Sequence, residues 1–134
     1  MPGTLTISTL SDGTNSTSST NSIRGPAKAW ANFDASSGAI SIRSSYNISS
    51  ITYNTTGEYT ANFTTSFADA NYCAVGSVSK YSPRPNDGNE VIMFKNKTSG
   101  TYGLTASSAR FTTLTPSGNS GEDCPLVCVA FIGN

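Results

Sequence analysis

Short runs in which apolar and polar residues alternate, separated by clusters of turn-forming residues, recur along most of this chain. Side chains two residues apart share a face of an extended strand, so such a run predicts a strand with one buried face. In the run at 27–33 one side is apolar and the other is not: Ala27, Ala29, Ala31 and Phe33 against Lys28, Trp30 and Asn32. About eight such runs, with no helical periodicity, predict an all-β fold, an antiparallel, jelly-roll-like β-sandwich.

The clearest predicted hairpin joins the runs at 48–53 and 58–64 through residues 54–57, because Gly57 supplies the positive φ that a tight loop needs. In its second run, Tyr59, Ala61 and Phe63 share one face. The other expected strands lie at 27–33, 39–43 (continued by 46–48), 72–78, 90–95, 102–105, 109–114 and 126–132.

The chain divides into a polar arm at 1–24 and a β-sandwich domain at 25–134. Residues 11–22 are almost all small and polar and cannot form a core, whereas the alternation of Leu5, Ile7 and Leu10 suggests pairing with something else. We therefore expect assembly with other subunits to order this arm.

Composition excludes several functions. Eight basic and eight acidic residues give zero net charge, so nothing favours nucleic-acid binding. No apolar run approaches the roughly 20 residues that span a bilayer, and the N-terminus lacks the basic and apolar regions of a signal peptide. About three residues in ten are Ser or Thr, which together with the dispersed aromatics favours a soluble β-rich chain.

The three cysteines are too few and too scattered for a disulfide framework. Cys124 and Cys128 would lie about 13 Å apart along a strand, beyond disulfide reach. We expect Cys73 and Cys128 to be small buried apolar residues and Cys124 a free thiol at a loop edge.

No catalytic arrangement is recognisable. The absence of histidine excludes Ser-His-Asp and Cys-His sites, and the acidic residues fall mostly in turns, where Asp serves the backbone. A hard-cation site at Asn86, Asp87 and Glu90 is a weak alternative. We therefore predict a protein that is not an enzyme and needs no metal or cofactor; a glycan-degrading enzyme would need two converging carboxylates.

One loop carries groups suited to binding a glycan, since amides and short acids bond to sugar hydroxyls and aromatic rings contact sugar C–H surfaces. Pro83 and Pro85 limit its entropy. The simpler interpretation of this loop is an ordinary hydrophilic connection between strands. Trp30, outside the loop, is likewise more often a packing or interface residue than a platform for a ligand. The candidate ligand-binding residues are Tyr81, Arg84, Asn86, Asp87 and Asn89.

Several segments resemble, in a consistent order, a module of tail-fibre-like proteins of bacteriophages, especially marine and cyanobacterial ones. They cover about half the chain: 25–33 (GPAKAWANF), 45–52 (SYNISSIT), 56–64 (TGEYTANFT), 68–72 (ADANY) and 129–134 (VAFIGN). Residues 80–123 carry no matching motif. The family supplies no binding residues to carry over, and fibres usually have a long N-terminal shaft or attachment domain, whereas this module begins almost at Met1.

The resemblance implies a virion structural protein, a tail fibre or fibre tip, made in the host cytoplasm and released without a signal peptide. It implies a homotrimer in contact with other virion proteins and with host cell-surface polysaccharide, so that it mediates host adsorption. Two readings stay open: a receptor-binding tip, and an architectural head- or collar-decorating protein without receptor binding. The first predicts that replacing Tyr81 and Arg84 with Ala weakens binding to host cells.

Overall fold

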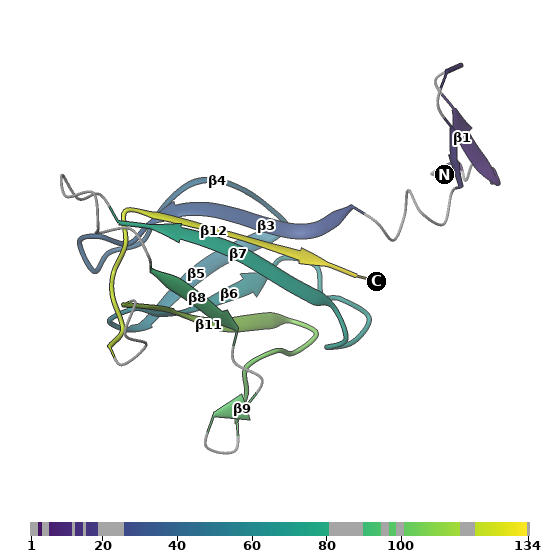
Figure 1. Cartoon of the computed structure of the whole chain (residues 1–134). Helices are drawn as coiled ribbons and strands as arrows, with labels where there is room; N and C mark the ends of the chain where they lie inside the picture. Colours follow the sequence, from purple (N-terminus) through teal and green to yellow (C-terminus); the bar gives the residue numbers. More distant parts are fainter. Residues whose placement is uncertain are drawn as a thin grey trace.

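The prediction of an all-β sandwich is confirmed by a computed structural model, which describes residues 3, 6–11, 13–14, 16–18, 26–80, 90–94, 97–98, 101–115 and 120–133. Two antiparallel four-stranded sheets pack face to face (Figure 1). Among the residues described, no helix is long and apolar enough to cross a membrane.

The first sheet, here the β3 sheet, has the strand order β4-β3-β12-β7. Its strands are β3 (Ala27–Asp34), β4 (Ser41–Tyr46), β7 (Cys73–Ser79) and β12 (Leu126–Ile132). The second, the β6 sheet, has the order β5-β6-β11-β8 and consists of β5 (Ile48–Thr55), β6 (Glu58–Phe63), β8 (Val91–Phe94) and β11 (Ser108–Leu114). Two short hairpins pair β1 (Thr9–Ser11) with β2 (Ser16–Ser18) and β9 (Lys97–Thr98) with β10 (Thr101–Tyr102).

The two inner faces meet in a core of aromatic rings. The alternation predicted at 27–33 and 58–64 is confirmed, because Ala29, Ala31 and Phe33 are buried and so are Tyr59, Ala61 and Phe63. Across the interface Phe33 lies 5.5 Å from Tyr59, ring centre to ring centre, and Phe131 lies 5.1 Å from Phe63. Edge-on ring pairs of this kind add to the stability that burial alone provides.

The chain changes sheets at Asn47, which the sequence suggested would continue an extended segment through 46–48. That expectation is wrong, since Asn47 has a φ of 56° and bends the chain from β4 into β5. Asn tolerates this conformation better than most residues. Its side chain fixes the bend, because the amide donates to the Thr65 carbonyl at 2.9 Å and the amide oxygen accepts from the Thr65 N–H at 2.7 Å.

The predicted hairpin at 48–64 is confirmed as β5 and β6, joined by a turn at Thr56 and Gly57 that is shorter than the predicted 54–57 loop. Gly57 has a φ of 69°. A positive φ at this point costs glycine nothing, which is why the turn can close in two residues.

The N-terminal hairpin of β1 and β2 forms a sheet of its own, apart from the two large sheets (Figure 1). Leu10 pairs with Thr17 across it, and Ile7 and Leu10 are both exposed. That two apolar side chains face solvent is consistent with an arm that meets another subunit, but its ordering by assembly stays a prediction.

The cysteines lie differently from what the sequence suggested. Cys73 is exposed at the start of β7, Cys124 is fully buried in the segment before β12, and Cys128 is intermediate; all three are free thiols. The expectation of a buried Cys73 is therefore wrong, because its position in β7 faces away from the core. Burial raises the pKa of the Cys124 thiol to about 11.

Thiol labelling should separate these environments. We expect a thiol-specific alkylating reagent at pH 8 to modify Cys73 rapidly and Cys124 only after unfolding, because Cys124 is buried and the thiolate is the reactive species. Peptide mapping by mass spectrometry assigns each modified residue, and Cys73→Ser serves as the control. Equal labelling rates for Cys73 and Cys124 in the folded protein would contradict the structure.

Candidate binding face

The predicted ligand-binding loop cannot be compared with the structure, because Tyr81, Arg84, Asn86, Asp87 and Asn89 all lie outside the described residues. Its two flanks are described. Lys80 follows β7 and forms an ion pair with Glu122, and Glu90 precedes β8. Both flanks therefore lie at the same end of the sandwich as the segment around residue 122, since Val91 pairs with Leu114 and Leu114 pairs with Gly121. The role of the loop stays a prediction.

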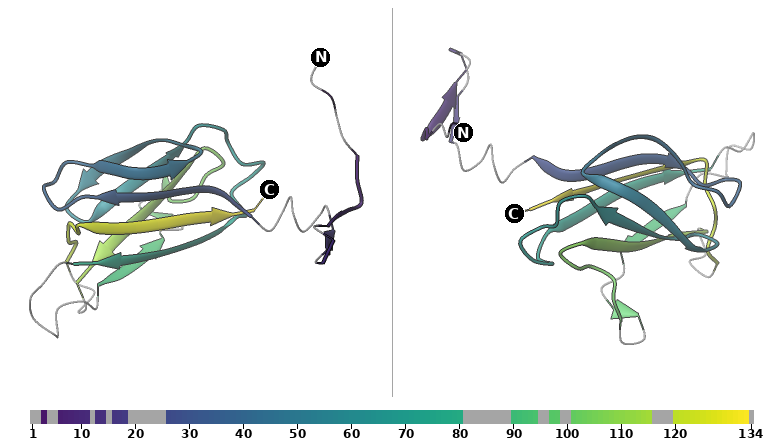
Figure 2. Two further views of the ribbon diagram at one scale, coloured as in Figure 1. Left: turned by 90° about the horizontal axis from the view of Figure 1, so that it is seen from above. Right: turned by 180° about the vertical axis from the view of Figure 1, so that it is seen from behind.

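The outer face of the β3 sheet carries a row of apolar side chains that runs across all four strands. Tyr46 of β4 pairs with Trp30 of β3, Trp30 pairs with Ala130 of β12, and Ala130 pairs with Val75 of β7. We call these four residues the Trp30 row. Figure 2 (left) looks down on this sheet and shows the strands lying side by side. Because directly paired residues point to the same side, the four side chains form one continuous strip.

The three larger side chains of the Trp30 row are exposed, which is unusual for side chains of this size. Tyr46 is 59% exposed, Val75 45% and Trp30 37%. An open hollow of about 500 Å³ lies between Trp30 and Val75. Its lining is mostly apolar, with polar groups from three strands: Asn32, Ser77 and Cys128. The alternation at 27–33 already placed Trp30 on the face opposite Ala29 and Ala31, and its role as a packing or interface residue stays a prediction.

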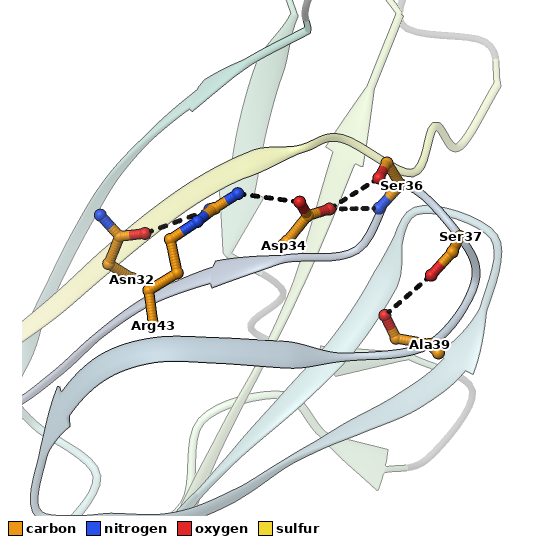
Figure 3. A network of polar contacts seen from close by, with 6 residues as sticks. All are labelled: Asn32, Asp34, Ser36, Ser37, Ala39 and Arg43. Carbon is orange, nitrogen blue, oxygen red and sulfur yellow. Dashed lines mark hydrogen bonds and ion pairs between the residues drawn. The ribbon is translucent and has the colours of Figure 1, made fainter.

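A polar network borders this hollow (Figure 3). Arg43 of β4 donates to the Asp34 carboxylate at 2.8 Å and, more weakly, to the Asn32 side-chain oxygen at 3.4 Å. The backbone and hydroxyl of Ser36 donate to the other carboxylate oxygen at 2.9 and 2.7 Å. These Ser36 bonds, followed by the charge of Arg43, lower the pKa of Asp34. The network holds Arg43 beside Asn32, at the edge of the hollow.

A second hollow, of about 230 Å³, adjoins Tyr46. It is lined by Lys28 of β3, the bend residue Asn47, and the segment that follows β6: Thr65, Ser66 and Phe67. Lys28 and Trp30 are alternate residues of one strand and share its outer face. Trp30 therefore lines a mostly apolar hollow, and its neighbours Lys28 and Tyr46 line a second one.

The described carboxylates mostly serve the fold. Asp123 accepts hydrogen bonds from the Gly57 N–H and the Tyr59 hydroxyl, both at 2.7 Å, and from the Tyr53 hydroxyl at 3.0 Å. Glu58 accepts from Arg110 at 2.6 Å. Within the described ranges, no group of three or more Cys, Asp or Glu side chains could hold a metal ion. The chemistry that this face offers is stacking and hydrogen bonding.

Comparison with protein-family models, with curated proteins and with solved structures finds no match for the chain. The fold and the face define an antiparallel β-sandwich with an exposed aromatic pair, Trp30 and Tyr46, on one sheet. What such a face binds has to be argued from its own chemistry.

Proposed function

We propose that this chain is a non-enzymatic structural module of a phage virion, a tail fibre or fibre tip, that adsorbs to host cell-surface polysaccharide through the outer face of the β3 sheet. The observation that carries the binding part is the exposed pair of neighbouring rings, Trp30 and Tyr46, beside an open hollow. The virion part is supported by the resemblance of the five segments to fibre modules.

A polysaccharide suits this face for two reasons. The C–H surface of a sugar ring packs on an aromatic face, and Trp30 and Tyr46 offer two such faces on adjacent strands, which are about 4.8 Å apart. Sugar hydroxyls need donors and acceptors beside the rings, and Asn32 and Ser77 line the same hollow. A sheet holds these groups rigidly, so little entropy is lost on binding.

For self-assembly we propose a different surface, the edge of the β6 sheet. β8 is an edge strand of the β6 sheet, and its Val91 and Met93 are exposed apolar residues. An edge strand has backbone groups free to pair with another chain. This edge and the exposed Leu10 of the N-terminal hairpin support a homo-oligomer. We expect a trimer in which the Trp30 row stays open.

The test is binding of the purified full chain to extracted envelope polysaccharides and to host cells. We expect saturable binding that quenches or shifts the fluorescence of Trp30, the single tryptophan of the chain. Trp30→Ala should weaken binding by roughly tenfold to a hundredfold, the usual cost of losing a stacking residue. The double variant Tyr81→Ala, Arg84→Ala tests the loop in the same assay.

If the oligomer binds no envelope polysaccharide, and particles that lack it adsorb normally, the receptor function is wrong. If the loop variant loses binding and Trp30→Ala does not, the binding surface is the loop.

The architectural alternative, a head- or collar-decorating role, is favoured by the apolar character of the Trp30 row, which could also pack against a neighbour. In that case Trp30 would be shielded from soluble quenchers in the assembled oligomer.

A further inference from the structure

We infer that the ligand of this face is an acidic polysaccharide, whose sugar rings lie on Trp30 and Tyr46 and whose anionic group is held by Lys28 in the adjoining hollow. This inference rests on the proposed function and specifies its ligand. It is carried by the position of one cation relative to the Trp30 row.

Lys28 differs from the other basic side chains that the structure describes. Arg43 pairs with Asp34 at 2.8 Å, Arg110 pairs with Glu58 at 2.6 Å, and Lys80 pairs with Glu122. For Lys28 there is no carboxylate partner within the described ranges, although it is half-buried. An ammonium group that has no internal counter-ion is free to pair with the anionic group of a ligand.

The hollow around Lys28 offers further donors to an anion. Ser66 and Tyr46, whose side chains end in hydroxyl groups, line it together with the apolar Phe67. In the described part of the chain, neither the Tyr46 hydroxyl nor the Ser66 hydroxyl forms a hydrogen bond. Charge-assisted hydrogen bonds from an ammonium and hydroxyl groups to a carboxylate or sulfate are stronger than neutral ones.

The two hollows are linked by one pair of neighbouring residues: Trp30 lines the first hollow, and Tyr46, which pairs directly with Trp30, lines the hollow that Lys28 also lines. A ligand that spans them would need an apolar ring surface and an anionic substituent close together. An acidic sugar has both. A nucleic acid would need a cluster of cations, whereas this chain has zero net charge and, among the described residues, this face offers one lysine without a carboxylate partner.

The experiment compares matched ligands on matched variants. The ligands are uronic-acid and sulfated oligosaccharides, each paired with its carboxyl-reduced or desulfated counterpart. The proteins are the full chain, Lys28→Met, Lys28→Arg and Lys80→Met, which removes the same charge at the opposite end of the sheet. Circular dichroism verifies that each variant is folded, and titration calorimetry measures affinity.

We expect the unaltered chain to bind the acidic ligand roughly tenfold or more tightly than its neutral counterpart. Lys28→Met should abolish that preference without changing affinity for the neutral ligand, while Lys28→Arg and Lys80→Met keep it. Added salt should weaken binding of the acidic ligand alone. The uronic-acid and sulfated series distinguish which anion the hollow prefers.

Equal affinity for the acidic and neutral ligands would overturn the assignment of Lys28 and leave the proposed function standing. An equal loss from Lys28→Met and Lys80→Met would also overturn it, since only net charge would then matter. If no oligosaccharide of either kind binds, both the inference and the proposed function fail.

Discussion

Replacing Phe131 with Ala is expected to lower the free energy of unfolding by about 3–5 kcal/mol. Phe131 is fully buried on β12, in the middle of the β3 sheet. Its ring centre lies 5.1 Å from that of Phe63 and 6.0 Å from that of Phe94, both on the opposite sheet, and 5.9 Å from that of Tyr72. Removing the ring leaves a cavity where the two sheets meet, and rigid strands cannot collapse to fill it.

Urea unfolding followed by circular dichroism measures this loss, and Tyr46→Ala is the matched control. Tyr46 is an aromatic residue of similar size on the outer face of the same sheet, and we expect its removal to cost about 1 kcal/mol or less. Because a loss of 5 kcal/mol can unfold a marginal domain, Phe131→Leu provides a milder variant that should still fold. Similar losses for Phe131→Ala and Tyr46→Ala would contradict the assignment of inner and outer faces.

Replacing Gly57 with Ala is expected to lower the free energy of unfolding by about 2–5 kcal/mol. Two effects add. A residue with a Cβ is strained at a φ of 69°, and a Cβ here would lie 2.5 Å from the Thr113 carbonyl oxygen and closer still to the Glu122 amide. The turn would have to move, which would also disturb the Gly57 N–H bond to Asp123 and leave the buried Tyr59 hydroxyl without its best acceptor.

Gly38→Ala separates these two effects. Gly38 has a φ of 70°, nearly the same as Gly57, but a Cβ there would meet nothing within 4 Å. We therefore expect a loss of about 1–2 kcal/mol from backbone strain alone. The difference between the two variants measures how tightly the β5–β6 turn packs on the segment at 121–123. If Gly38→Ala costs as much as Gly57→Ala, that packing contributes nothing.

The candidate site shows how far sequence reasoning reaches. The alternation at 27–33 already placed Lys28, Trp30 and Asn32 on one face, and the structure confirms that face. The sequence did not predict that Tyr46 would be a neighbour of Trp30, because the chain was expected to continue straight through Asn47. Nor did it predict Ala130 and Val75 in the same row, since nothing local records which strands pair.

The sequence by itself determined most strands of the two large sheets, the inner and outer faces at 27–33 and 58–64 and the Gly57 hairpin, because each depends on side-chain period and backbone preference within a few residues. Tertiary structure alone decided the strand order, the bend at Asn47, the exposure of Cys73 and the burial of Cys124. These depend on which distant strands pair and in what register, and many pairings satisfy the same local pattern. The Trp30 row and the Lys28 hollow exist because β3 pairs with β4 and β12 in one register, which brings separate segments of the chain to a single face.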